Sequence, residues 1–347
     1  MPAFPALVEL LRATRSRAVA GGVDANEYER IAQTMESFDD WPSVFVLAAE
    51  GHLERAQIAE REGRPTSAGE AYLNAAACLH TATTVPLAAP EVHARAADAL
   101  HRALTYLDSA AVHLSGSSFA GVLRHPTGEP DAPLVVIVPG MDSSKVEFFA
   151  VSEALLRRGL ATLSIDGPGQ GELTTTSVPT LRYDHVVGAA LDAAETAGHT
   201  PPAVGLIALS LGGFYGATTL AQESRIVAGV IISGPSSLTW QLLPPPVQLI
   251  LTQRYHGDED AARRFADAID VETIAAKITQ PLLVVDGTSD VIPGVANGEL
   301  LAQLATNGSH LMIDDGDHLV GNRRPEWLPL AGDFLHQHLT VDREQRH

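Results

Sequence analysis

The first third of the chain has the spacing of amphipathic helices. Apolar side chains recur at intervals of three and four residues, as at Leu100, Leu104 and Leu107, and this period gives each helix one buried stripe. We find no convincing strand signal before about residue 115 and no recurrence at a fixed period. The predicted helices are Pro5–Arg17, Ala25–Met35, Trp41–Glu62, Thr66–His80 and Pro90–Leu114. We therefore predict a helical cap domain over residues 1–117.

From Phe119 the pattern changes to short apolar runs separated by helical stretches such as Lys145–Arg158 and Tyr183–Ala197. This alternation predicts an α/β domain over residues 118–347, with a mostly parallel, doubly wound sheet. Ligands of such sheets bind outside the carboxyl ends of the strands. The predicted strands are Ala120–Leu123, Leu134–Val138, Ala161–Ile165, Val204–Leu209, Gly229–Ser233, Pro281–Val285 and His310–Ile313.

Residues 235–278 interrupt the alternation of strands and helices. The segment contains three consecutive prolines at 244–246 and a charged helical stretch, Asp258–Ile269, and it is too long for a simple connection. We interpret it as a lid-like insertion. Trp240 and Tyr255 are candidates to line a substrate pocket there, although packing within the lid is the alternative role.

Charge and cysteine content exclude several classes of function. The chain has 347 residues and a formal net charge of −19, which disfavours binding to nucleic acid or to anionic membranes. A single cysteine, Cys78, rules out an internal disulfide, and the histidines of the cap show no metal-ligand spacing. The N-terminus lacks the basic stretch of a secretory signal. We expect a cytoplasmic protein that uses neither metal nor cofactor.

One turn carries the features of a nucleophile elbow. Ser210 lies between the apolar run Val204–Leu209 and a helical stretch, in the motif A-L-S-L-G at 208–212. Small residues around the serine allow a strained turn that holds its hydroxyl above the sheet edge. Ala208 replaces the glycine that usually opens this motif. We predict Ser210 as the nucleophile; an ordinary strand-turn-helix junction is the alternative.

Two later turns supply partners for Ser210. Asp290 follows one predicted strand and His318 follows the last one, so both side chains should reach the same sheet edge. We predict that Ser210, Asp290 and His318 form a catalytic triad, in the chain order of α/β-hydrolases. Asp286 is closer to its strand end and is predicted to cap the turn.

The turn after Leu134–Val138 begins P-G-M-D at 139–142. We predict that its Met141 amide and the Leu211 amide form an oxyanion hole; a turn without a catalytic role is the alternative. The glycine-rich loop D-G-P-G-Q-G-E at 166–172 lacks the spacing of a phosphate loop. We interpret it as a rigid pocket floor with Asp166 capping the turn. The acids Asp314, Asp315 and Asp317 are interpreted as solvated.

These motifs resemble those of α/β-hydrolases with an N-terminal helical cap, the group that contains 2,6-dihydroxypseudooxynicotine hydrolase and the fermentation-respiration-switch-like esterases. The resemblance rests on Pro139–Glu147, Gly159–Glu172, Ser210–Gly213 and the cap segment Ala59–His80. It implies a cofactor-free serine hydrolase, often dimeric, that acts on a small molecule between cap and sheet.

In the nicotine-pathway member of this group, a carbon–carbon bond next to a ketone is hydrolysed and a glutamate follows the oxyanion turn. Asp142 occupies that position here and is a candidate substrate-binding residue, with helix capping as its alternative role. We therefore expect cleavage of a carbon–carbon bond next to a ketone, or of an ester, in an aromatic or polyketide-like substrate. Acyl transfer or cyclisation on the same scaffold, and a non-catalytic binding protein, are the alternatives.

Overall fold

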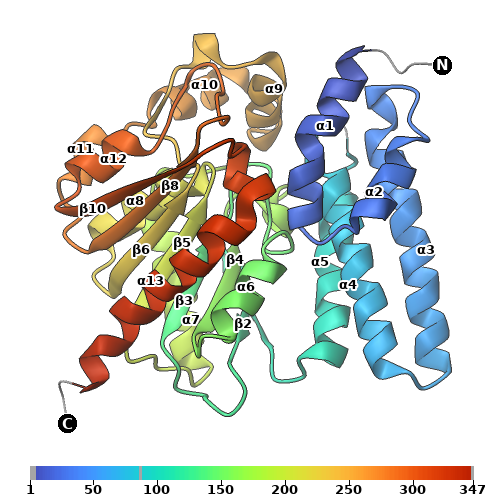
Figure 1. The fold of residues 1–347 in the computed structure, drawn as a ribbon, viewed down its shortest axis with the longest axis horizontal. Helices are drawn as coiled ribbons and strands as arrows, with labels where there is room; N and C mark the ends of the chain where they lie inside the picture. The colour runs from blue at the N-terminus through green and yellow to red at the C-terminus, as the bar shows by residue number, and fades with distance from the viewer. Residues whose placement is uncertain (1–4, 86–87, 345–347) are drawn as a thin grey trace.

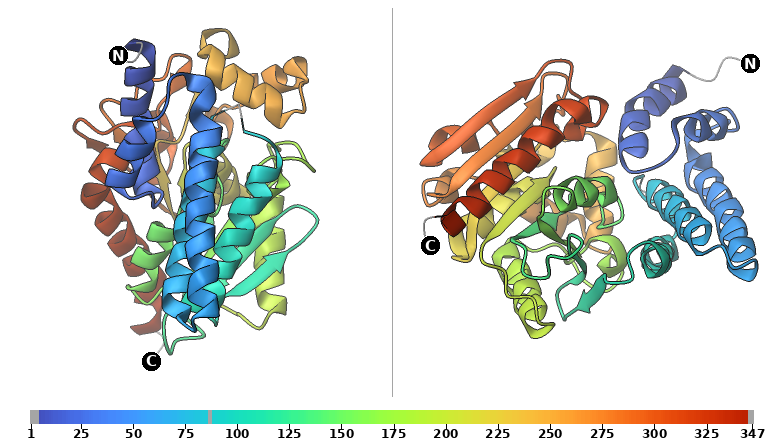
Figure 2. Two further views of the ribbon diagram at one scale, coloured as in Figure 1. Left: turned by 90° about the vertical axis from the view of Figure 1, so that its right-hand side faces the viewer. Right: turned by 60° about the horizontal axis from the view of Figure 1, so that its bottom comes forward.

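The computed structural model describes residues 5–85 and 88–344. Its N-terminal part consists of helices that stand beside an α/β part (Figure 1), and Figure 2 shows that α3 and α4 run along much of its height. Asp24 caps α2 by accepting hydrogen bonds from the amides of Asn26 and Glu27. The N-terminal helices are α1 (Pro5–Ala20), α2 (Ala25–Ala32), η1 (Phe38–Asp40), α3 (Trp41–Arg61), α4 (Pro65–Ala82) and α5 (Glu91–Leu107).

The N-terminal helices have a hydrophobic core of their own. Trp41 and Phe45 are fully buried on α3, with ring centroids 4.8 Å apart, and the Trp41 indole donates a hydrogen bond to the Thr81 carbonyl. Five of the eleven buried residues of α4 are alanines, and their small side chains let α3 and α5 pack closely against it. Val122 and Val146 extend this core into the α/β part.

The central sheet has the strand order β1-β2-β4-β3-β5-β6-β8-β10. The strands from β4 to β10 are parallel, and β1 and β2 add antiparallel pairs at one edge. The predicted α/β architecture is therefore confirmed. The strands are β1 (Val112–Ser115), β2 (Ala120–Arg124), β3 (Leu134–Val138), β4 (Ala161–Asp166), β5 (Val204–Leu209), β6 (Ile226–Ile232), β8 (Pro281–Gly287) and β10 (Asn307–Ile313).

The prediction that the last cap helix continues to Leu114 was wrong. The helix α5 ends at Leu107, and β1 follows after a turn. The strand is short, lies at the sheet edge and alternates half-buried with exposed positions. Its apolar residues Val112 and Leu114 therefore lack the continuous hydrophobic run that revealed the central strands.

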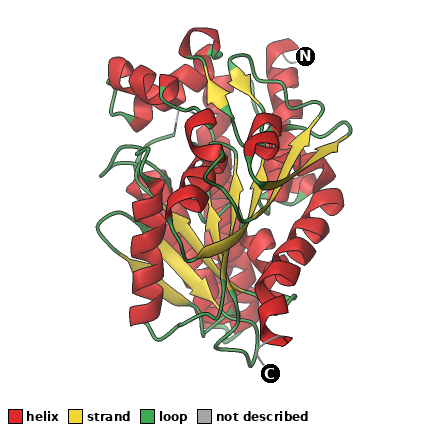
Figure 3. Ribbon diagram, turned by 90° about the vertical axis from the view of Figure 1, so that its left-hand side faces the viewer, coloured by secondary structure: helices red, strands yellow, loops and turns green. Residues whose placement is uncertain are grey.

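Helices cover both faces of the sheet (Figure 3). Side chains of α6 and α13 pack on one face, and those of α7, α8 and α12 pack on the other. No helix among the described residues is long and apolar enough to cross a membrane. These helices are α6 (Phe149–Leu156), α7 (Tyr183–Thr196), α8 (Gly212–Gln222), α12 (Glu299–Leu304) and α13 (Arg324–Glu344).

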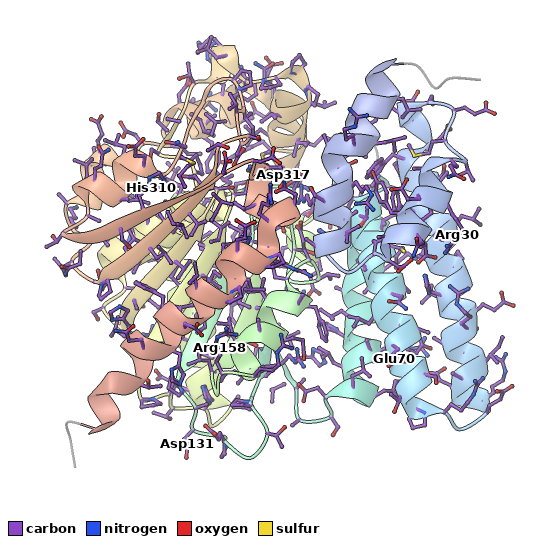
Figure 4. All side chains as sticks on the ribbon, viewed as in Figure 1. Arg30, Glu70, Asp131, Arg158, His310 and Asp317 are labelled. Carbon is purple, nitrogen blue, oxygen red and sulfur yellow. The ribbon has the colours of Figure 1, made fainter. Side chains whose placement is uncertain are left out.

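Much of the segment between β6 and β8 lies at the top of the view in Figure 1, where α9 and α10 are labelled, and above the label of Asp317 in Figure 4. Asp258 caps α10 by accepting a hydrogen bond from the Ala261 amide. The segment also gives β7, which pairs with β9 in a second, two-stranded sheet. The elements of this segment are β7 (Ser237–Leu238), η3 (Trp240–Leu242), α9 (Pro245–Arg254), α10 (Glu259–Asp267) and α11 (Glu272–Ala275). Three short elements lie elsewhere in the chain: β9 (Val295–Ala296), η2 (Gly171–Leu173) and η4 (His318–Arg323).

Candidate active site

Ser210 forms the turn between β5 and α8. Its φ of 55° lies in the left-handed region, where a residue with a side chain is strained and needs support from its surroundings. The Ser210 amide donates to the Ile232 carbonyl over 2.9 Å, and its carbonyl accepts from the Gly213 amide over 2.7 Å. A methyl group at position 213 would lie 2.4 Å from the Gly234 Cα, so only glycine fits there.

The alanine at the start of the motif is accommodated by a glycine on the following helix. Ala208 is fully buried on β5. A Cβ on Gly216 would lie 2.7 Å from the Ala208 Cβ, closer than two carbon atoms pack. The bare backbone of α8 at position 216 therefore provides the space that the methyl group of Ala208 occupies.

The structure brings Ser210, His318 and Asp290 into one row of hydrogen bonds. Ser210 Oγ lies 2.9 Å from His318 Nε2, and His318 Nδ1 lies 3.0 Å from both carboxylate oxygens of Asp290. Burial favours the neutral imidazole, but the hydrogen bond and charge of Asp290 raise the pKa of His318 above its ordinary value. The same contacts outweigh burial at Asp290 and lower the pKa of its carboxyl group.

A second serine, which the sequence analysis missed, supports this row. Ser233 follows β6, has a φ of 50° and is buried. Its hydroxyl accepts a hydrogen bond from the Leu319 amide over 3.0 Å, and a hydrogen bond from Ser233 helps to lower the pKa of Asp290. Ser233 thus ties the acid to the backbone next to His318.

The turn after β3 lies against Ser210. A Cβ on Gly140 would lie 2.9 Å from the Ser210 Cβ. Among the described residues, no group accepts a hydrogen bond from the Met141 or Leu211 amide. Both predicted donors are therefore unoccupied and belong to segments that meet at the serine.

The glycine-rich loop fixes this turn. Gln170 donates from its amide nitrogen to the carbonyls of Pro139 and Gly140, over 2.7 and 2.9 Å, and accepts from the Tyr183 hydroxyl. Asp166 caps its own loop as predicted, because its carboxylate accepts a hydrogen bond from the Glu172 amide over 3.4 Å. It is fully buried and also accepts from the backbone and side-chain nitrogens of Lys145, each over 2.7 Å.

Comparison with known proteins agrees with this arrangement. Residues 129–256 match the family described as serine aminopeptidase, S33. The chain is 26% identical over 320 residues to 2,6-dihydropseudooxynicotine hydrolase from Paenarthrobacter nicotinovorans, covering 88% of this chain and 86% of that one. The chain has the α/β-hydrolase fold.

Two further similarities extend over different lengths. The crystal structure of a 2,6-dihydroxy-pseudo-oxynicotine hydrolase superposes on this structure with a TM-score of 0.83, at 24% identity, over 94% of this chain and 96% of that one. The α/β hydrolase ucsC from Acremonium sp. is 27% identical over 261 residues, which cover 65% of this chain and 53% of that one. The first similarity includes the N-terminal helices as well as the sheet.

Asp142 contacts the helix α1. Both of its carboxylate oxygens accept from Arg17 on α1, over 2.7 and 3.1 Å, and Arg17 also binds both oxygens of Glu147. Burial would raise the pKa of the Asp142 carboxyl, but Arg17 lowers it below its ordinary value. Asp142 is therefore an ion-paired carboxylate, and it does not cap a helix, since α6 begins only at Phe149.

The helix α1 also contacts the turn that carries His318. Ser16 donates a hydrogen bond to Asp317, and Arg324 donates to the Ala20 carbonyl over 2.6 Å. Asp317 is thus not the purely solvated acid that we expected. One helix of the N-terminal part holds both the turn of Met141 and the turn of His318.

A cavity of about 430 Å³ opens between the N-terminal helices, α9 and the turn after η2. Trp240 and Tyr255, our candidates for its lining, do not line it. Trp240 is buried in the core of the α/β part, and the Tyr255 hydroxyl donates to the Pro179 carbonyl over 2.9 Å. Their neighbours on α9, Ile250 and Arg254, line the cavity instead.

One group in the N-terminal part has the composition of a metal site. Ligand atoms of Glu27, His52 and Cys78 lie within 4.8 Å of one another. However, His52 Nδ1 accepts from Arg55 over 2.7 Å and Nε2 contacts Glu27 over 2.8 Å, so the imidazole has no free lone pair. Burial also raises the pKa of the Cys78 thiol to about 12. Glu27, His52 and Cys78 are therefore in contact with other side chains of the cap and are not arranged to bind a metal ion.

Proposed function

We propose that the α/β-hydrolase is a serine hydrolase that cleaves a carbon–carbon bond next to a ketone, or an ester, in an aromatic or polyketide-like small molecule. The observation that carries this proposal is the continuous row Ser210–His318–Asp290, with distances of 2.9 and 3.0 Å. Such a row occurs where a hydroxyl must lose its proton during attack on a carbonyl.

In the proposed reaction Ser210 Oγ attacks the substrate carbonyl and His318 Nε2 takes its proton. The amides of Met141 and Leu211 bind the oxyanion, and Asp290 stabilises the imidazolium and fixes the tautomer of His318. His318 then returns the proton to the leaving group: the carbon of a stabilised carbanion, or the oxygen of an alcohol. Water, activated by the same histidine, releases the acyl group from Ser210.

We propose that Asp142 restrains the turn that carries the Met141 amide and does not donate a proton to the substrate. Its carboxyl group is ionised and paired with Arg17, so it has no proton to give to a leaving group. It follows Met141 directly in the chain, and its contact with Arg17 restrains that turn. We propose that this restraint keeps the Met141 amide directed toward the oxyanion.

The test begins with Ser210→Ala. We expect it to abolish turnover of p-nitrophenyl acetate and of an aryl β-diketone, and to abolish labelling by a fluorophosphonate, while Ser43→Ala, an exposed serine of the cap, changes neither. The ratio of the two rates in the parent enzyme distinguishes ester from carbon–carbon cleavage. Turnover that survives Ser210→Ala contradicts the proposed mechanism.

We also propose that the enzyme is a homodimer, on the strength of the resemblance of its motifs to the capped hydrolases. Light scattering of the purified chain at several concentrations measures the assembly directly. A single species of about 37 kDa, the mass of one chain, at all concentrations contradicts the dimer.

A further inference from the structure

The cavity of about 430 Å³ is lined by both apolar and nitrogen-bearing side chains. Ile250 of α9 and Pro90, just before α5, contribute apolar surface, while Arg254 and His93 contribute nitrogen atoms. The cavity is large enough for a drug-sized molecule. Since its lining comes from the N-terminal helices as well as from the segment between β6 and β8, a ligand there would contact both.

Arg254 differs from the other strongly buried cations of the chain. Arg124 contacts Asp108 and Glu153, and Lys145 contacts Asp166 and Glu172. Arg254 is only 5% exposed, yet no carboxylate of a described residue lies within 4.0 Å of it. A buried cation without a counter-ion is costly, so this arrangement indicates that the counter-ion comes from outside the chain.

The contacts of Arg254 leave part of its guanidinium group available. Its Nε donates to the Met141 carbonyl over 3.1 Å, and its Nη1 lies 3.5 Å from His93 Nε2. The second terminal nitrogen, Nη2, has no hydrogen bond to any described residue. The negative charge of Asp142 attracts Arg254 without direct contact, and both carboxylate oxygens of Asp142 are hydrogen-bonded to Arg17 instead.

His93 is suited to share an anion with Arg254. Burial, with the adjacent positive charge of Arg254, lowers the pKa of His93 to about 3. At neutral pH the imidazole is uncharged, so Nε2 accepts from Arg254 and Nδ1–H is a donor. The cavity thus offers a fixed cation and a neutral hydrogen-bond donor next to apolar surface.

We propose that Arg254 and His93 bind an acidic group of the substrate, a carboxylate or an equally planar anion, and that the enzyme is selective for acidic substrates. The inference rests on the proposed function, because the site is assigned to the same substrate. The geometry supports it: Arg254 contacts the carbonyl of Met141, whose own amide is the proposed oxyanion donor. An acid held by Arg254 therefore lies next to the turn that carries the proposed oxyanion donor.

The net charge of −19 makes this selectivity unexpected from composition alone. An acidic protein repels anions at long range. A bidentate contact to a buried guanidinium acts at short range, where water is excluded and the interaction is strong. Selectivity for an acid therefore has to come from a local cation such as Arg254.

The kinetic test compares two esters of similar length, p-nitrophenyl valerate and the mono-p-nitrophenyl ester of glutaric acid. We expect the parent enzyme to have the higher kcat/KM on the glutarate monoester. Arg254→Gln should lower kcat/KM on this ester about 100-fold, and on the valerate ester less than about threefold. Arg254→Lys should keep part of the preference. Arg263→Gln, which removes an exposed arginine of α10, should leave both rates unchanged.

Binding gives a second readout that does not depend on turnover. In the Ser210→Ala background, calorimetry with the intact glutarate monoester should detect binding that Arg254→Gln weakens about 100-fold and Arg263→Gln does not. Equal losses on both esters, or equal binding of both esters to Ser210→Ala, would overturn the inference. Normal charge-selective binding combined with turnover that survives Ser210→Ala would instead overturn the mechanism and leave the anion site standing.

Discussion

Neighbouring side chains set the proton affinities at the site. The carboxylate of Asp290 raises the pKa of His318, and the same contact lowers the pKa of Asp290. Ser210, His318 and Asp290 could be predicted from the sequence because each follows a strand end, and the ends of parallel strands meet at one edge. Arg17, His93 and Arg254 could not be predicted, because they come from helices and no local spacing marks their partners.

Asp290→Asn tests the pKa argument. An imidazole that accepts the Ser210 proton must be neutral, so kcat/KM in the parent enzyme should fall as the pH falls through the raised pKa of His318. Asp290→Asn removes the negative charge beside His318, so the pKa of His318 should fall. The acidic limb of the pH profile of kcat/KM should then move to lower pH. We also expect kcat to fall about 10⁴-fold because the tautomer is no longer fixed. Asp314→Asn, at an exposed acid, is the matched control; an unmoved limb would contradict the assignment.

At the level of elements, continuous apolar runs were the most reliable signal. The strands β3 and β5 begin and end where the sequence indicated, because both faces of a central parallel strand are buried. The edge strand β1 was missed because its burial alternates. The packing of α8 on β5 could not be foreseen either, since the fit of Ala208 against Gly216 depends on a contact between two elements.

The fit between Ala208 and Gly216 predicts that Gly216→Ala changes the free energy of unfolding in opposite directions, depending on the residue at position 208. Gly216→Ala should destabilise the chain by about 1–3 kcal/mol, because its methyl group would lie 2.7 Å from the Ala208 Cβ. In an Ala208→Gly background that clash is absent, and Gly216→Ala should then stabilise by up to about 1 kcal/mol through its helix propensity. Urea unfolding of the four variants measures this. The same sign in both backgrounds would contradict the proposed contact.

At the scale of the whole molecule, ion pairs join the N-terminal helices to the α/β part. Arg17 binds the buried Glu147 and the partly buried Asp142, and Glu147 also contacts His80 on α4. Burial would raise the pKa of Glu147, but Arg17 and His80 lower it far below its ordinary value. The sequence gives no sign of this network, because more than a hundred residues separate Arg17 from Asp142 and Glu147.

Removing Arg17 should therefore be costly. We expect Arg17→Met to lower the free energy of unfolding by about 3–5 kcal/mol at pH 7, because one buried and one partly buried carboxylate lose their partner. Both carboxyl groups have lowered pKa values in the folded chain. Their stabilising effect is present at neutral pH and is lost as the pH falls, so the difference from the parent should shrink below about pH 4.5.

Arg15→Met provides the matched control for Arg17→Met. Arg15 lies on the same helix and pairs with Glu29, but both side chains are about half exposed. An exposed pair contributes about 1 kcal/mol or less. Urea unfolding at pH 7 and at pH 4 compares the variants. If the two substitutions lower the free energy of unfolding equally, burial of the Arg17 ion pairs does not add to stability.

The contact between Ser16 and Asp317 joins positions 301 residues apart. Translation produces α1 well before the His318 turn, so a nascent chain can form this helix long before its partner exists. Until the ribosome has added residue 317, the side of α1 that faces this turn stays uncovered. The order of synthesis thus delays assembly of the reactive centre until the chain has been extended by 301 positions beyond Ser16.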